Sequence, residues 1–276
     1  ALNGMVYEER VYAPAAEGSA LLRRTLTKWD KSSGTYNRPS PGTGTYTPSR
    51  NPRPIKTVTM WLDTGGDALT KTTSFEYDTT YWWNVGLDRT SSSEYGFTLV
   101  DQNTAQNAAV DSLPLGTLVR TTNTTYTTGD PNYRNRNILG LPTYSSISDA
   151  NGVVSQTFVD YDESSYPLLS LGPVTGWNDP QTTYRGNPTT VRRWLNYPSV
   201  TWIQTHTQYD QYGNVRKTWD GMDRLDPATE LDYSSSYYYG YPTTISTIAP
   251  DPSGTYGQPA SFVKTTVFDA NTGLVT

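Results

Sequence analysis

The chain has 276 residues, a formal net charge of −5 and no cysteine. The acidic balance disfavours a nucleic-acid partner, which needs a basic face, and the lack of cysteine excludes disulfides, thiolate catalysis and cysteine metal sites. With 22 Tyr and 8 Trp against 5 Phe, and with 22 Gly and 19 Pro, the composition favours strands and many turns over helices. The composition also predicts sheets that are either solvent-exposed on one face or packed mainly by aromatic rings.

Period-two alternation in the first part of the chain indicates strands at residues 5–13, 21–29, 56–62 and 70–77. Residues 31–54 are rich in Ser, Gly, Thr and Pro, which predicts a long exposed loop and either a boundary or an insertion. The one segment that favours a helix is 102–110. No run of about 18 apolar residues predicts a membrane span, and residues 1–12 lack the basic start and apolar core of a signal peptide.

The second part of the chain contains a repeated frame. It reads GLPT at 140–143, GNPT at 186–189 and GYPT at 240–243, and aromatic–aspartate pairs follow at Tyr161-Asp162, Tyr209-Asp210 and Phe268-Asp269. Proline directly after Gly-X suits the first residue of a strand. The series predicts an all-β fold of serial antiparallel hairpins, an organisation more typical of extended sheets than of a compact enzyme core.

These patterns divide the chain into three segments: a pre-repeat segment at 1–55, a degenerate repeat region at 56–139 and hairpin repeats at 140–276. Residues 272–276 are expected to begin a further strand that has no partner. The array is therefore expected to stop in mid-repeat.

The clearest turn is YDQYGNV at 209–215, between two alternating runs that predict a β-hairpin. Asp210 is expected to accept hydrogen bonds from the backbone that follows it. Gly213 can take the left-handed conformation that closes a type I turn with a bulge, and Asn214 tolerates similar geometry. The structural turn residues of this and the last repeat are Tyr209, Asp210, Gly213, Asn214, Phe268, Asp269 and Gly273.

YDQYGNV and FDANTGLV resemble the YD repeats of bacterial RHS proteins, in which Tyr-Asp is followed by two variable residues, Gly, Asn or Arg, and an aliphatic residue. Gly213-Asn214-Val215 fits this pattern, and Gly273-Leu274-Val275 fits it with one extra residue. Tyr77-Asp78 and Tyr161-Asp162 lack the following glycine. The opening ALNGMVYEERVYA, with LLRRTLTKWD behind it, is similar to the segment that precedes the repeats in RHS-like and Tc-toxin B-type proteins.

The resemblance implies an extended, curved β-sheet strip that forms part of a shell around a C-terminal toxic or effector segment. The chain would be a non-catalytic structural module of a large exported bacterial protein, secreted or at the cell surface. Its partners would be the remaining repeats and the enclosed effector of the same polypeptide.

Residue types that are often catalytic in other proteins have simpler interpretations in this sequence. His206, the only histidine, lies in a predicted strand without a nucleophile frame, so we expect a strand-surface side chain and not a catalytic base. The sequence contains no GxSxG, phosphate loop or HExxH, and no enzyme activity or cofactor is predicted.

Acidic residues gather at 160–163 and at Asp220, Asp223 and Asp226, where a glycosidase pair is an alternative to solvated turn acids, which we favour. The spacing of Asp269, Asn271 and Gly273 echoes the first half of a calcium loop but lacks the bidentate glutamate, so no metal site is predicted.

Aromatic clusters give the alternative function. Tyr81, Trp82 and Trp83, and likewise 237–239, would place neighbouring rings on opposite faces of a strand, which suits stacking on glycans. Cross-strand aromatic pairing is the interpretation that we favour. The alternative is a cell-surface carbohydrate-binding or adhesion module. Arg192 and Arg193 would point to opposite faces, so cross-strand ion pairs or cation–π contacts are expected.

Overall fold

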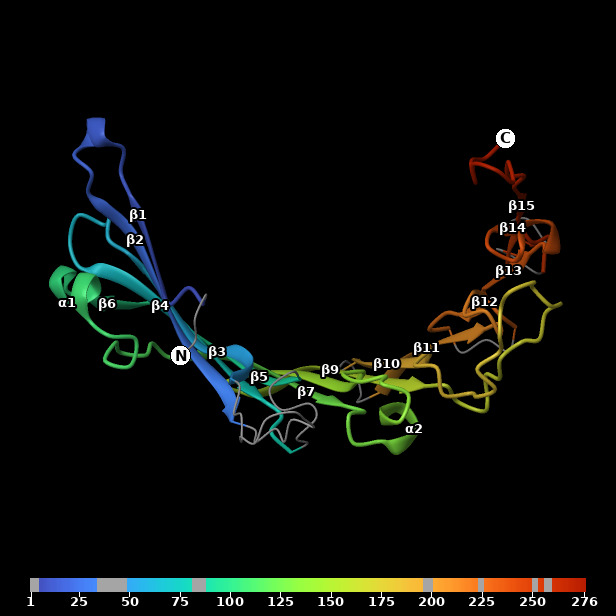
Figure 1. Cartoon of the computed structure of the whole chain (residues 1–276), viewed down its shortest axis with the longest axis horizontal. Coiled ribbons are helices and arrows are strands. Elements are labelled where there is room, and N and C mark those ends of the chain that lie inside the picture. Colours follow the sequence, from blue (N-terminus) through green and yellow to red (C-terminus); the bar gives the residue numbers. More distant parts are fainter. Residues whose placement is uncertain are drawn as a thin grey trace, which may run out of the picture. The chain divides into compact units, whose positions relative to one another are not determined.

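The computed structural model describes residues 5–33, 49–80, 88–195, 201–222, 226–249, 253–255 and 260–276. These residues form one open, antiparallel, 15-stranded sheet (Figure 1). The strands follow one another in chain order, except that β6 leaves the series and pairs with β4. The prediction of an all-β chain of serial antiparallel hairpins is confirmed.

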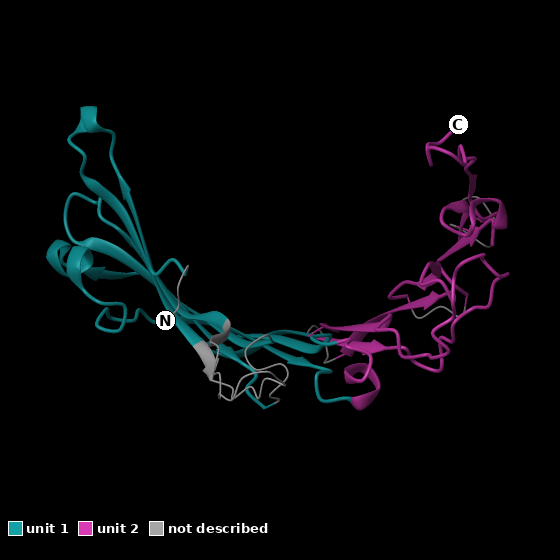
Figure 2. Ribbon diagram, viewed as in Figure 1, with its two compact units in different colours: residues 1–130, 139–156 teal, residues 131–138, 157–276 magenta. Residues whose placement is uncertain are grey.

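The chain divides into two compact units (Figure 2), residues 1–130 with 139–156 and residues 131–138 with 157–276. Unit 1 holds β1 (Glu8–Tyr12), β2 (Leu21–Ser33), β3 (Ser49–Trp61), β4 (Ala68–Tyr77), β5 (Arg89–Tyr95), β6 (Thr98–Val100), β7 (Leu118–Tyr126), β8 (Pro142–Asp149), the 3₁₀ helix η1 (Ala15–Glu17) and α1 (Gln102–Asn107). Unit 2 holds α2 (Pro131–Arg134), β10 (Pro188–Leu195), β11 (Thr201–Tyr209), β12 (Val215–Trp219), β13 (Thr229–Tyr233), β14 (Pro242–Thr247), β15 (Val263–Thr265) and η2 (Ser235–Tyr237). The remaining strand, β9 (Gly152–Tyr161), belongs to both units. No helix among the described residues is long and apolar enough to cross a membrane.

Unit 1 is built around a small aliphatic core. Val58 and Met60 alternate on β3, so both face the same side of the sheet, and both are fully buried. The segment that contains β6 and α1 packs over this face. The buried cluster is Leu26, Val58, Met60, Leu62, Ala68, Val100, Ala105 and Leu113.

Basic side chains of the sheet hold α1 in place. Arg24 Nη1 donates to the carbonyls of Ala105 and Ala108, at 2.9 and 3.0 Å, and Lys56 Nζ donates to the carbonyl of Val110 at 2.8 Å. The Ala105 carbonyl belongs to the last turn of the helix, where carbonyls lack a partner within the helix. Ala108 and Val110 follow the helix, so the two cations hold both its C-terminal turn and the segment after it. The helix ends at Asn107, earlier than the predicted 110, because Ala108 is already extended.

Aromatic rings do much of the packing in unit 2. Phe158 meets Trp202 edge to face, with ring centroids 5.2 Å apart, and the Tyr212 ring stacks on Tyr239 at 5.5 Å. Such pairs contribute beyond the area that they bury. Aromatic packing, one of the two modes that the composition allowed, is therefore present in unit 2.

The prolines of the repeated frames begin strands, as predicted. Pro142, Pro188 and Pro242 are the first residues of β8, β10 and β14. Proline lacks the N–H that an interior ladder position would donate, so the start of a strand accommodates it.

Two predictions about loops and ends are wrong. Residues 31–33 and 49–54 are not loop, because the pairing of β2 with β3 continues past a bulge at Trp29 as far as Ser33 and Ser49; residues 34–48 lie outside the described part. Residues 272–276 do have a partner, since Val275 forms a bridge with Phe268 and the Thr276 N–H donates to the Val267 carbonyl at 3.0 Å.

Candidate functional site

An aromatic residue recurs where every second strand of the series pairs with the next strand. The pairs are Trp29–Pro54, Tyr77–Arg89, Tyr126–Pro142, Tyr161–Pro188, Tyr209–Val215, Tyr233–Pro242 and Phe268–Val275. In all but the last, a shift of register lies beside the pair. Two further pairs of the same kind, Tyr12–Leu21 and Tyr95–Leu118, lie on intervening strands. The structural repeat is therefore a bulged aromatic position at every second strand, with two additional copies in unit 1.

The sequence pattern found only part of this series. Aspartate follows most of the aromatic residues, but Thr127 follows Tyr126 and Ser234 follows Tyr233, so a search for aromatic–aspartate pairs misses these two copies. The repeated proline frame is the sequence signal that identifies these two copies, because the prolines of GLPT and GYPT pair with Tyr126 and Tyr233. Tyr77-Asp78 and Tyr161-Asp162 occupy equivalent positions although no glycine follows them.

Tyrosine hydroxyls connect consecutive copies. Tyr77 donates to the Pro54 carbonyl at 3.0 Å, Tyr126 to the Arg89 carbonyl at 2.9 Å and Tyr209 to the Pro188 carbonyl at 3.3 Å. Each acceptor is the residue that pairs with the preceding aromatic of the series. Burial raises the pKa of all three phenols, which keeps them protonated as donors.

The Asp210 turn is closed by its own backbone and side chain. The Asp210 N–H donates to the Asn214 carbonyl at 2.9 Å, and the Gly213 N–H donates back to the Asp210 carbonyl at 3.0 Å. Asp210 Oδ1 accepts from the N–H groups of Tyr212 and Asn214, at 2.9 and 3.0 Å. Gly213 has a φ of +89°, and the Asp210 side chain is fully buried.

The Asp269 turn repeats this arrangement with one more residue. The Asp269 N–H donates to the Leu274 carbonyl and the Gly273 N–H to the Asp269 carbonyl, both at 2.8 Å. Asp269 Oδ1 accepts from the N–H groups of Asn271 and Thr272, which holds the pKa of the carboxyl below its usual value. Protein donors therefore already occupy Asp269 Oδ1. In the part of the chain that the structure describes, no group of three or more histidines and carboxylates is arranged to hold a metal.

The acidic cluster at 160–163 does not consist of solvated turn acids, and this prediction is wrong. Asp162 Oδ2 accepts from the N–H groups of Arg185 and Gly186, at 2.8 and 2.7 Å, and Oδ1 accepts from that of Asn187 at 3.1 Å. The carboxylate thus closes the long loop 162–187 by binding the backbone at its far end.

The neighbours of Asp162 are also paired. Glu163 Oε2 accepts from the Thr189 hydroxyl at 2.8 Å. Asp160 forms an ion pair with Arg192 at 2.9 Å, and the Arg192 guanidinium lies 5.1 Å from the centre of the Phe158 ring. This arginine makes both of the contacts expected for it, with Phe158 as its aromatic partner.

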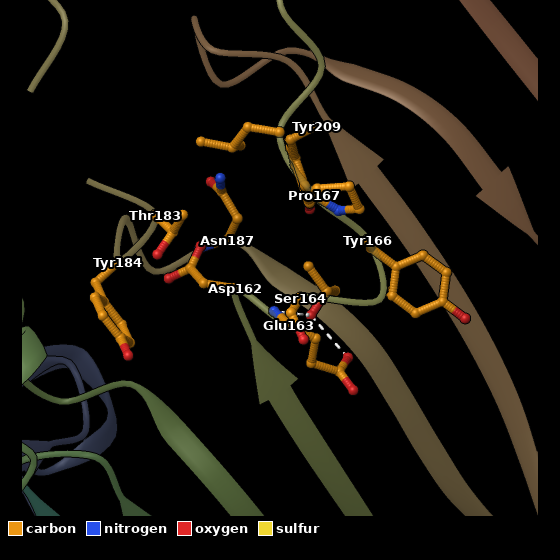
Figure 3. Close-up of a pocket in the computed structure, with 11 residues that line it drawn as sticks. Asp162, Glu163, Ser164, Tyr166, Pro167, Thr183, Tyr184, Asn187 and Tyr209 are labelled. Atoms are coloured by element: carbon orange, nitrogen blue, oxygen red, sulfur yellow. Dashed lines mark hydrogen bonds between the residues drawn. The ribbon is translucent and has the colours of Figure 1, made fainter. Parts of the chain in front are cut away.

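A pocket of about 370 Å³ lies beside this loop (Figure 3). Asp162 and Glu163 lie between two tyrosine rings, Tyr184 on one side and Tyr166 on the other. Tyr166 stacks on His206 with centroids 4.7 Å apart, and His206 Nδ1 lies 2.9 Å from the Thr190 hydroxyl. The histidine is therefore a packing residue of β11 with a polar partner.

The remaining predicted site residues are those of the second acidic cluster and the proposed stacking residues. Asp220 accepts from the Met222 N–H at 3.1 Å, Asp226 is exposed, and Asp223 lies outside the described residues. The proposed stacking residues Tyr81, Trp82 and Trp83 also lie outside them.

Residues 237–239 are not in a strand, which is the condition on which the expected alternation of their rings depended. The Ser234 side chain accepts from the Ser236 N–H and caps η2, and Tyr238 and Tyr239 have left-handed φ values of +52° and +57°. Strand alternation therefore does not describe where these rings point.

No protein-family model and no curated protein matches this chain.

Proposed function

We propose that this chain is a non-catalytic structural module, a stretch of YD/RHS-type repeat from the wall of a large exported bacterial protein. In that role it would form part of a β-shell that encloses or presents a C-terminal effector, with the remaining repeats of the same polypeptide as its partners.

The recurrence of a bulged aromatic position along the strand series carries the proposal. Tyr77, Tyr126 and Tyr209 make the same hydroxyl-to-carbonyl bond although the residues around them differ. A stabilising contact that repeats with the strand series favours an element whose purpose is to continue a sheet. The carboxylates of Asp162, Asp210 and Asp269 are all occupied by backbone donors, which favours a structural role over catalysis.

The gene that encodes the chain provides the first test. We expect further aromatic–aspartate hairpins and an effector segment in the same reading frame, and electron microscopy of the whole product should show a hollow particle. A reading frame without such repeats on either side would contradict the proposal. A hydrolytic activity on polysaccharides that Asp162→Asn abolishes, with the fold intact by circular dichroism, would replace it with an enzyme.

A further inference from the structure

Two pockets, one in each unit, are built from corresponding positions of the repeat. The pocket of unit 2 is lined by Asp162, Thr189 and Tyr209 among others. A shallower pocket of about 590 Å³ in unit 1 is lined by Asp78, Thr90 and Tyr126. In each, the aspartate follows the tyrosine that ends one strand, and the threonine is the second residue of the next strand in the sheet. The second tyrosine ends the strand that follows in the sheet order.

The backbone around the two pockets is closed in the same way. The Asp78 N–H donates to the Asp88 carbonyl at 2.9 Å, and the Asp162 N–H donates to the Asn187 carbonyl at 3.0 Å. In both cases the acceptor is the residue just before the next strand. The pockets are therefore a product of the repeat, because the same strand ends and the same tyrosine hydroxyl bonds shape them.

The following copy shows how the repeat can fill this position. There the second residue of the next strand is Arg216 and not threonine. Its guanidinium lies 5.8 Å from the centre of the Tyr233 ring and pairs with Asp232 at 2.6 Å. In the two pocket copies the shorter threonine side chain stands at this position, and the space that an arginine side chain would fill is left open.

The chemistry of the lining selects the class of ligand. The described residues that line the two pockets supply hydroxyl, amide and carboxylate groups with tyrosine rings, and none of them is Lys, Arg or His. An anionic ligand would find no cation and would face the charges of Asp162 and Glu163 or of Asp78 and Asp130. Hydroxyl and amide groups both donate and accept, which suits a neutral ligand rich in hydroxyls.

Two features of the unit 2 pocket point to an occupant. Tyr184 is 39% exposed, so its ring faces the solvent. It makes an edge-to-face contact with the Tyr133 ring, with centroids 5.6 Å apart, which restrains its orientation. Asn187 Nδ2 is buried without a hydrogen-bond partner. Native structures seldom leave such a donor unsatisfied, because doing so costs free energy. Because water does not reach this atom, a ligand hydroxyl can accept from it only after the Asn187 amide rotates toward the pocket.

We propose that these pockets bind single residues of a neutral saccharide, with Tyr184 and Asn187 as the main contacts in unit 2. This binding is independent of the structural role proposed above. A shell wall without saccharide binding, and saccharide binding without a shell, are separate outcomes.

Saturation-transfer NMR on the whole chain, with glucose, galactose, mannose, N-acetylglucosamine and their neutral oligomers as probes, tests the proposal. We expect transfer to at least one neutral sugar and a loss of about tenfold in affinity in Asn187→Leu, the size expected when one good hydrogen bond is removed. Because Asn187 Nδ2 has no protein partner, the melting temperature without sugar should not fall. Tyr184→Ala should also weaken binding, and Tyr7→Ala, which removes a 70% exposed ring elsewhere, should not.

Three results would overturn the assignment. The first is the absence of transfer to every neutral sugar in the panel. The second is full binding by both Asn187→Leu and Tyr184→Ala. The third is binding only to spermidine, lost at high salt, which would make these pockets amine sites.

Discussion

The hydroxyl of Tyr209 donates a hydrogen bond to the carbonyl of Pro188, 3.3 Å away. Pro188 pairs with Tyr161, the preceding aromatic of the series. The bond therefore connects one repeat with the next through a side chain, in addition to the backbone ladder. Tyr126 makes the same bond to Arg89, which pairs with Tyr77.

Removing one of these hydroxyls should weaken the sheet without changing its register. We expect Tyr209→Phe and Tyr126→Phe each to lower the free energy of unfolding by about 1 kcal/mol, because each leaves a carbonyl without its side-chain donor. Urea denaturation followed by tryptophan fluorescence measures the loss. Tyr7→Phe is the matched control, since its ring is 70% exposed. Equal stability of all three variants would show that the hydroxyl bonds contribute nothing.

Gly213 is required by its backbone conformation and not by lack of space. Its φ is +89° and a Cβ at this position would meet nothing within 4 Å. We expect Gly213→Ala to cost roughly 1–2 kcal/mol, the price of a left-handed alanine, and Gly213→Asn to cost less. Gly66→Ala is the control, since Gly66 also has open space but no positive φ. Thermal unfolding by circular dichroism should leave that control nearly unchanged, and a similar loss in both alanine variants would contradict the conformational argument.

Asp210 should be the most sensitive carboxylate of the repeat. It is fully buried and accepts from two backbone N–H groups and from the Asn214 amide. Asp210→Ala leaves these donors unsatisfied, and we expect a loss of roughly 2–4 kcal/mol. Asp269→Ala should cost less, because its turn is more open to water. The hydrogen-exchange rates of residues 201–219 should rise in Asp210→Ala. A larger loss of unfolding free energy in Asp269→Ala than in Asp210→Ala would contradict this prediction.

The first strand should detach at low pH. Hydrogen bonds from Arg24 and Arg10 hold the pKa of Glu8 below its ordinary value of 4.5, with the Arg24 contact at 2.9 Å. A lowered pKa means that the pairing stabilises the fold above the ordinary value and that this stability is lost as pH falls through the folded value. We expect lower amide protection in β1, relative to the intrinsic exchange rate at each pH, below about pH 4.5.

Glu8→Gln should show the low-pH behaviour of β1 at neutral pH, and Glu17→Gln, at an exposed position, should not. Amide exchange measured by NMR between pH 3 and 7 separates the two variants. Unchanged protection of β1 in Glu8→Gln would contradict this role for the ion pair.

Local patterns predicted a large part of the fold. Alternation and turn residues indicated serial antiparallel hairpins, and the proline frames indicated where β8, β10 and β14 begin. The Asp210 turn was predictable because all its hydrogen bonds within the motif join residues at most four positions apart. Contacts of that range depend on residue type and order alone.

The tertiary structure decided the rest. Asp162 binds backbone groups 23 to 25 residues away, and Tyr126 and Tyr233 take repeat positions without a following aspartate. The unit 1 and unit 2 pockets require strands that a sequence pattern cannot place side by side. By itself, the sequence determined which strands and short turns form, because hydrophobic period and turn chemistry act within a few residues. Only the folded sheet determined which distant groups meet, because strand register and loop closure bring them together.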